Sequence, residues 1–139
     1  MEIAADRERA WAAVVAWVGR PPRSGAERGA ALLGCRERVT AGDPGEAGST
    51  IVVFRVARSE RPVELALAGR HRFSDYALTF RIDDLGGDRS RLRAITRAEF
   101  PGVRGRLYRA LVIGSRLHVR AVRAILASVR ARAEAHGGG

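Results

Sequence analysis

The sequence predicts an α+β domain in which a curved antiparallel β-sheet meander grips a long C-terminal α-helix. Five short segments of alternating apolar and polar residues follow one another between residues 31 and 100. Such alternation is typical of half-buried strands. An amphipathic segment of about thirty residues, Val103–Ala135, comes next and is typical of one long helix. A long helix laid across a curved sheet tends to leave a cavity between the two.

Length and composition indicate a single domain, residues 1–139, that can bury its own core. The chain has 139 residues, of which 46% are hydrophobic and 29% charged, as in ordinary globular proteins. No apolar stretch approaches the roughly 20 residues of a membrane-spanning helix. The N-terminus lacks the pattern of a secretory signal. We therefore expect a cytoplasmic protein, with residues 136–139 as a disordered tail.

The net charge of +10 comes from arginine alone, because all 25 basic residues are Arg and none is Lys. Together with frequent Ala and Gly, this is typical of a GC-rich genome. A nucleic-acid-binding protein is expected to use both cations on phosphates. The charge is therefore weak support for an anionic partner.

The N-terminal residues predict a strand end followed by a short helix. Met1–Ala4 has the apolar Ile3 of a strand, and Asp6 lies where a helix N-cap is expected. Apolar residues at three- and four-residue spacings continue the helix to Val18. Glycine and prolines then end it, and Arg20–Gly29 is expected to be a polar connector.

The meander is expected to contain five strands, each bounded by turn residues. They are Ala31–Val39, Thr50–Arg58, Val63–Phe73, Tyr76–Asp84 and Arg89–Phe100. A two-residue turn at Ser74–Asp75 would pair Phe73 with Tyr76 and Leu67 with Ile82. The apolar faces of both strands then coincide, as they must if one face is buried.

The C-terminal segment has an apolar arc and an arginine face when read at 100° per residue. The arc contains Tyr108, Leu111, Val112, Ser115, Val119, Val122, Leu126 and Val129. The opposite face contains Arg106, Arg109, Arg116, Arg120 and Arg123. One helix of this length spans roughly 50 Å, so it should cross the sheet diagonally. Gly114 predicts either a hollowed helix face over a ligand or a kink.

This order of elements resembles the START-like, or SRPBCC, superfamily of helix-grip domains. The similarity covers nearly the whole chain and is carried by Leu65–Phe73, Tyr76–Phe80 and Phe100-Pro101-Gly102. These segments are similar to an uncharacterised bacterial branch of the superfamily, which includes polyketide cyclases or dehydrases and lipid-transport proteins. The resemblance implies that a hydrophobic ligand binds between sheet and helix. It does not imply a reaction, because no catalytic signature is shared across the superfamily.

The sequence departs from the usual superfamily pattern in its N-terminal half. The first strand is nearly absent, the meander has five strands where six are common, and the connector is short for the usual second helix. These differences predict a smaller cavity or one open at its end.

The predicted inner surface defines a candidate ligand site. It comprises Phe54, Leu67, His71, Tyr76, Leu78, Phe80, Thr96, Tyr108, Leu111, Ser115 and Val119. His71 is its chief polar group, because the flanking Arg70 and Arg72 point outwards. Two interpretations are open: a neutral core histidine, or a polar anchor or acid–base group in an apolar pocket. The aromatic residues likewise either pack the core or orient a ligand through tyrosine hydroxyls.

The remaining chemically active residues give weaker indications of function. The single cysteine, Cys35, is expected to be a small core residue rather than a nucleophile. Glu37, on the same predicted face, needs a partner such as His71 or an arginine if it points inwards, or else turns to solvent. His118 is expected at the boundary of the helix arc. The histidines lack metal-ligand spacing, and no phosphate loop or dinucleotide motif occurs, so neither a metal nor a cofactor is expected.

Three hypotheses about function remain open. The first is a carrier or sensor of a small hydrophobic or aromatic molecule, acting as a monomer or homodimer. The second is a cofactor-free cyclase or dehydratase acting on a carbonyl substrate, with His71 and Tyr76 as the catalytic candidates. The third is an interaction module that presents the arginine face to an acidic partner surface, an anionic lipid or nucleic acid. Nucleic acid is disfavoured as that partner, because the predicted outer faces lack aromatic residues for base stacking.

Overall fold

The described residues, 1–21, 24–37, 40–114 and 116–135, form an α+β fold in a computed structural model. The expected tail, residues 136–139, lies outside them. The strands are β1 (Glu2–Ile3), β2 (Thr50–Ile51), β3 (Phe54–Glu60), β4 (Glu64–His71), β5 (Ser74–Asp84) and β6 (Ser90–Glu99). The helices are α1 (Arg7–Val18), α2 (Ala26–Leu33), α3 (Gly102–Gly114) and α4 (Leu117–Ala135).

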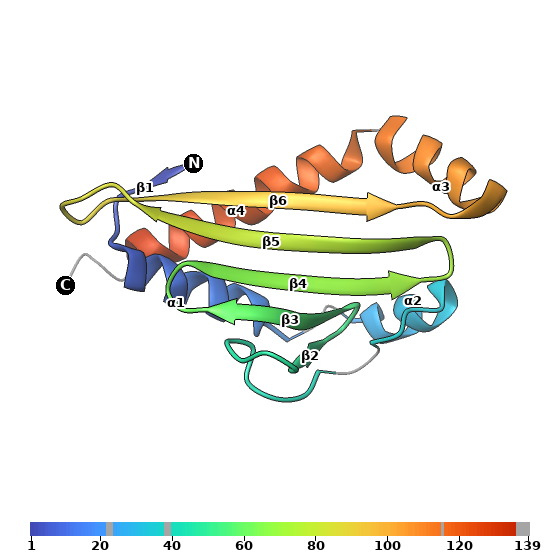
Figure 1. The fold of residues 1–139 in the computed structure, drawn as a ribbon, viewed down its shortest axis with the longest axis horizontal. Helices are drawn as coiled ribbons and strands as arrows, with labels where there is room; N and C mark the ends of the chain where they lie inside the picture. The colour runs from blue at the N-terminus through green and yellow to red at the C-terminus, as the bar shows by residue number, and fades with distance from the viewer. Residues whose placement is uncertain (22–23, 38–39, 115, 136–139) are drawn as a thin grey trace.

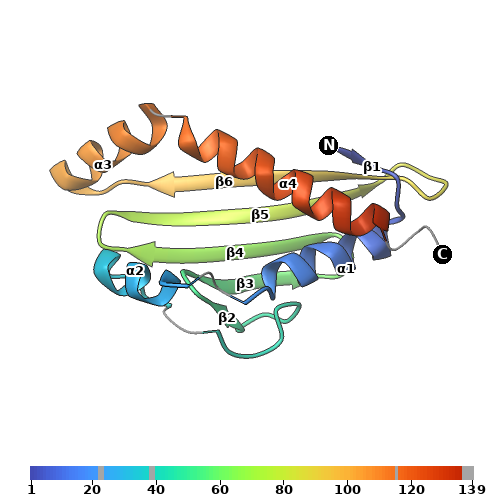
Figure 2. The ribbon, with the colours of Figure 1, turned by 180° about the vertical axis from the view of Figure 1, so that it is seen from behind.

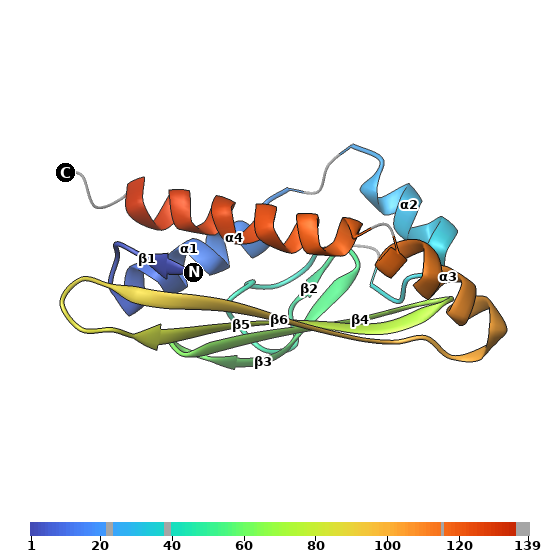
Figure 3. The same ribbon diagram turned by 90° about the horizontal axis from the view of Figure 1, so that it is seen from above.

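The strands form one antiparallel sheet in the order β1-β6-β5-β4-β3-β2. Figure 1 is viewed from the sheet face that lies away from the helices. Figure 2 shows the other face, which α4 crosses diagonally with α1 beside its C-terminal end. From above, the helices form a single layer over a twisted sheet (Figure 3). The predicted class, a curved sheet gripping a long C-terminal helix, is confirmed.

The N-terminal strand and helix form where the sequence predicts them. Glu2 of β1 pairs with Arg91 of β6. The Asp6 carboxylate accepts a hydrogen bond from the Arg9 N–H at 2.8 Å and so caps α1. The buried face of α1 consists of Ala10, Trp11, Ala13, Val14 and Val18. Through this face α1 packs against the sheet and α4.

The predicted strand Ala31–Val39 is wrong. Its first three residues end α2, whose C-cap Gly34 has the left-handed φ of 69° that commonly terminates a helix. The chain then runs along β4, and the Arg36 N–H donates to the Arg70 carbonyl at 2.9 Å. Residues 38–39 lie outside the described residues. The region thus supplies a second helix, together with an irregular segment that lies along β4.

The predicted strand Thr50–Arg58 is divided in two. Ile51 pairs with Phe54, so Val52 and Val53 form a two-residue turn between β2 and β3. Val53 has a φ of 72°, which is strained for a β-branched residue. Because the chain reverses here, β2 forms this edge of the sheet.

The β4–β5 hairpin has the predicted faces but not the predicted turn. Leu67 pairs with Leu78 instead of Ile82, and the turn consists of Arg72–Phe73 instead of Ser74–Asp75. The partner of each residue is therefore displaced by four positions. An even displacement leaves every side chain on its original face. The inner surface of the sheet consequently keeps its predicted residues.

The C-terminal segment is not one continuous helix. α3 ends at Gly114, and α4 begins at Leu117. Between them Arg116 has a φ of 54°, a left-handed conformation that cannot continue a right-handed helix. The two helices take different directions (Figure 3). The kink expected as one alternative at Gly114 is therefore present, whereas Ser115 lies outside the described residues.

Side chains fill the space between the layers at one end of the sheet. This core joins α1, the C-terminal half of α4 and the inner faces of β4, β5 and β6. Trp17 of α1 meets the Phe80 ring edge-on, with 5.7 Å between the ring centroids. Fully buried members include Val14, Leu65, Phe80, Leu92 and Val129. The packed end fixes where α4 lies over the sheet.

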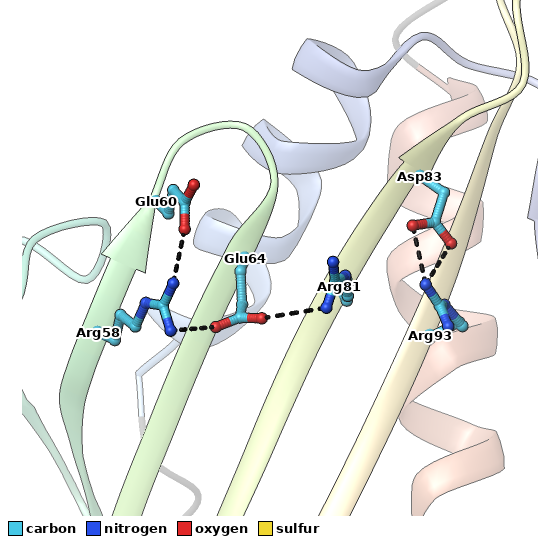
Figure 4. Close-up of polar contacts among 6 residues, drawn as sticks. All are labelled: Arg58, Glu60, Glu64, Arg81, Asp83 and Arg93. Carbon is cyan, nitrogen blue, oxygen red and sulfur yellow. Dashed lines mark hydrogen bonds and ion pairs between the residues drawn. The ribbon is translucent and has the colours of Figure 1, made fainter.

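The face of the sheet away from the helices carries ion pairs. Figure 4 shows Glu64 between Arg58 and Arg81, with nitrogen–oxygen distances of 3.6 and 3.9 Å. Arg93 pairs with Asp83 at 2.8 Å. Each such surface pair contributes about 1 kcal/mol or less.

Candidate functional site

A groove of about 680 Å³ separates the sheet from the N-terminal half of α4. Its mostly apolar wall is formed by β5, β6, α4 and the β6–α3 junction. The lining residues are Phe54, Tyr76, Ala77, Leu78, Thr96, Arg97, Ala98, Phe100, Arg106, Arg109, His118, Ala121, Val122 and Ile125. A concave, largely apolar site of this size is typical of those that bind small molecules.

One face of α4 forms both the groove wall and part of the packed core. His118, Ala121, Val122 and Ile125 recur at helical spacing and line the groove. The same face continues with Val129, which is fully buried in the core. The small side chain of Ala121 helps to leave the groove open, whereas Val129, further along the same face, fills the space beneath α4.

The charged groups of the groove are all basic or imidazole side chains. Arg106 and Arg109 of α3, Arg97 of β6 and His118 of α4 line it, and no Asp or Glu is among the lining residues. Arg106 and Arg109, expected on the face opposite the apolar arc, are exposed but line the groove, so that part of the prediction is wrong. The break at Arg116 changes the orientation of α3 relative to α4, so a single 100° repeat does not describe both helices.

His118 has an unsatisfied polar atom beside the groove. Its Nδ1 is buried and has no hydrogen-bond partner within the described residues. A buried imidazole nitrogen normally has a partner. His118, expected only at the boundary of the helix arc, lines the groove, whereas His71 is not among its lining residues.

An aromatic cluster adjoins the groove through Tyr76 and Phe100, which line it. The His71 ring lies 5.3 Å from the Tyr76 ring and 5.1 Å from the Tyr108 ring, centroid to centroid. Tyr108 also stacks on Phe73 at 5.6 Å, with an interplanar angle of 18°. These contacts attach α3 to the β4–β5 turn. His71 borders the groove through this cluster but is not among its lining residues.

The local environment of His71 favours a neutral, structural imidazole. Its Nδ1 accepts a hydrogen bond from the Phe73 N–H at 3.1 Å, across the turn. Burial lowers the pKa of His71, and the nearby Asp75 carboxylate opposes that shift. The ring thus supports the hairpin turn and packs against two tyrosines.

Tyr76 also uses its polar atom within the protein. Its hydroxyl donates a hydrogen bond to the Val53 carbonyl. Burial raises the pKa of Tyr76, and the neighbouring Cys35 and Glu37 raise it further. Cys35 is buried against this ring system, so its predicted place as a small core residue is confirmed.

Glu37 does not enter the groove. It is half-buried in a depression of about 470 Å³ that includes Arg36, Arg55 and Arg97. Glu37 was expected either to point inwards with a partner such as His71 or an arginine, or to turn to solvent. It matches neither fully, because it is half-buried outside the groove in a depression that arginines line. Arg97 lines both this depression and the groove.

The sheet residues of the predicted site divide into three groups. Those lining the groove are Phe54, Tyr76, Leu78 and Thr96. His71 and the helix residue Tyr108 border it in the aromatic cluster. Leu67 and Phe80 are buried in the packed core.

The helix residues of the predicted site are placed less well by the sequence. Leu111 is 73% exposed and Val119 is 36% exposed, so the expectation that they face the sheet is wrong. Both were placed on one arc drawn through the helix break. Ser115 lies outside the described residues.

The groove residues that the sequence did not indicate come mainly from α3 and α4. They include Arg106, Arg109, His118, Ala121 and Ile125. A helix read separately from Leu117 would have aligned His118, Ala121 and Ile125 with Val129. No sequence signal distinguishes Arg106 and Arg109 from the other arginines of this segment.

Neither a metal-binding cluster nor a membrane-spanning helix occurs among the described residues. Among the described residues, no three His, Cys, Asp or Glu side chains lie close enough to hold a metal ion. No helix in the same part of the chain has the length and apolar character needed to cross a membrane.

Comparison with known proteins supports the fold. No family model and no curated protein matches the sequence. A conserved protein from Geobacillus kaustophilus is similar in structure, with a TM-score of 0.50 and 14% identity over 98% of this chain and 90% of that one. The chain has a helix-grip type of fold. CalU16 from Micromonospora echinospora has a TM-score of 0.48 and 15% identity over 97% of this chain and 81% of its own.

Proposed function

We propose that this helix-grip protein is a carrier or sensor that binds a small hydrophobic or aromatic molecule in the groove, as START-like (SRPBCC) domains do. The observation that supports this function is the apolar groove of about 680 Å³. Burying 200 Å² of apolar ligand surface would contribute roughly 5 kcal/mol before the costs of association.

The way side chains pack along α4 supports the view that the groove is a fixed feature of the fold. α4 is fully packed at Val129 and Ala133, yet along the same face Ala121 and Val122 line open space. The packed end holds the helix at a fixed height above the sheet. This packing supports a groove of fixed depth beside the N-terminal half of α4.

The positions of His71 and Tyr76 favour binding over catalysis. The Nδ1 of His71 accepts a backbone hydrogen bond, and the Tyr76 hydroxyl donates one. A general base or acid needs its reactive atom within reach of the substrate. We therefore favour the carrier or sensor function over that of a cyclase or dehydratase.

The arginine face of α4 supports a further hypothesis less directly. Arg116, Arg120 and Arg123 are exposed and could contact an acidic partner. The interaction-module hypothesis remains a prediction for these residues. Nothing in their surroundings singles out a partner.

Filling the groove tests the proposed function. Ala121→Phe places a ring in the groove, whereas Ala124→Phe makes the same change at an exposed position of α4 outside it. Binding of the uncharged dye Nile red should weaken at least tenfold in the first variant and stay unchanged in the second. Circular dichroism checks that both variants fold. Equal dye binding by the two variants would show that the groove is not the binding site.

A further inference from the structure

We infer that the ligand is an amphipathic anion, with an apolar body in the groove and a carboxylate or phosphate head group at Arg106 and Arg109. This inference rests on the proposed function and names the ligand class. Its basis is the charge of the lining, which contains Arg97, Arg106, Arg109 and His118 but no carboxylate. An uncharged hydrophobic ligand would gain nothing from a lining that is rich in arginine and free of carboxylates.

The arginines at the groove differ from those on the opposite sheet face. There Arg58, Arg81 and Arg93 each lie within 4 Å of a carboxylate (Figure 4). Within the described residues, neither Arg106 nor Arg109 has an ion-pair partner. Residues 100–133 contain no Asp or Glu at all, so α3 and the groove side of α4 offer no partner of their own.

The positions of the apolar and basic lining residues indicate how the ligand is oriented in the groove. Leu78, Val122 and Ile125 supply apolar surface, whereas Arg106 and Arg109 are exposed side chains of α3. An apolar body would therefore lie between sheet and α4, with the head group at the solvent-exposed side. The planar guanidinium group suits this head group, because it binds carboxylate and phosphate oxygens through two parallel hydrogen bonds.

The N-terminal end of α4 lies at the same wall. His118, in the first turn of α4, lines the groove, and the free backbone N–H groups and helix dipole of such a turn favour negative charge. The arginines and the helix end thus favour the same sign of ligand charge.

Three ligands with one chain length and different head groups test the inference: decanoate, decyl phosphate and 1-decanol. Calorimetric titration below the micellar range should show decanoate or decyl phosphate binding about 10- to 100-fold more tightly than decanol, the gain expected of charge-assisted hydrogen bonds. Whichever anion binds more tightly identifies the head group. Decanol binding as tightly as both anions would overturn the inference and leave the proposed function intact. Absence of binding by all three would contradict the proposed function itself.

Two double variants with equal charge separate the site from general electrostatic attraction. R106Q/R109Q removes the groove arginines, and R120Q/R123Q removes two exposed arginines of α4 that do not line the groove. The first should cost the anion about tenfold or more in affinity and leave decanol binding unchanged. The second should change neither by more than about twofold at moderate salt. Equal losses of anion binding in both variants would overturn the assignment to Arg106 and Arg109.

Discussion

Gly69 lies against the ring of Tyr76, its partner on the neighbouring strand. A Cβ atom on Gly69 would come within 2.4 Å of the tyrosine Cε2 and 2.2 Å of the Val53 carbonyl oxygen. The missing side chain therefore lets the ring lie across β4 and reach the β2–β3 turn. Glycine within a strand often marks such a close approach.

Gly69→Ala should destabilise the protein by about 1–3 kcal/mol, because neither the backbone carbonyl nor the packed ring can move freely away. Gly29→Ala is a matched control, since no atom lies within 4 Å of its added methyl group in α2. That change should instead stabilise by about 0.5–1 kcal/mol through helix propensity. Urea denaturation measures both. A Gly69→Ala protein as stable as the wild type would contradict the contact.

Alkaline pH should weaken the fold through Tyr76. Its pKa is raised in the folded protein above the ordinary value of 10.0, so folding favours the neutral phenol. The stabilisation is complete below pH 10 and is lost as the pH rises above it. Tyr76→Phe should lose about 1 kcal/mol at neutral pH and flatten the decline. The free energy of unfolding is measured from pH 8 to 11 for both proteins. If stability falls equally in the variant, Tyr76 is not the group responsible for the loss.

Acid pH should weaken the fold through His71. Its pKa is lowered by burial below the ordinary value of 6.5, so the unfolded chain takes up a proton more readily. The contribution of His71 is fully present above pH 6.5 and declines as the pH falls below it. His71→Asn keeps a hydrogen-bond acceptor near Nδ1 but does not titrate, so this part of the pH dependence should vanish. Denaturation at several pH values checks the difference, and an unaltered slope would assign it to other groups.

The helix break predicts an unusual response to glycine. Arg116 has a φ of 54°, which costs an ordinary residue about 1 kcal/mol relative to glycine. Arg116→Gly should therefore raise the free energy of unfolding by about 0.5–1 kcal/mol. Arg116→Ala removes the same charge but keeps the Cβ and should be nearly neutral. In a continuous helix glycine would instead destabilise, so thermal denaturation of the two variants distinguishes the arrangements.

Alternation in the sequence predicted the strands whose one face is buried. β4, β5 and β6 form close to the expected bounds, and Leu65, Leu67 and Phe80 are buried as expected. The turn of the β4–β5 hairpin was not predictable in the same way. A shift by an even number of residues preserves every face, so the apolar pattern cannot distinguish between the two registers.

The remaining errors arise where the chain changes direction. Val53 adopts a left-handed conformation despite its branched side chain, which no turn signal indicates. Gly34 ends α2 with the φ of a helix cap, although the preceding residues had been read as a strand. The break before α4 means that one 100° repeat does not apply across both helices. Leu111 and Val119 were therefore assigned to the inner face but are exposed, and His118 was not included among the predicted site residues. The lining of the groove was thus predicted on its sheet side and only partly on its helix side.

The detachment of α3 from the core has a consequence for exchange. Val103, Leu107 and Leu111 of α3 are exposed, and among the described side chains the helix contacts the sheet through Tyr108 and the close approach of Gly105 to Phe100. Releasing these contacts requires less free energy than unfolding the packed end of the molecule. If the groove binds the proposed ligand, local opening of α3 would let that ligand enter and leave while the rest of the structure stays folded.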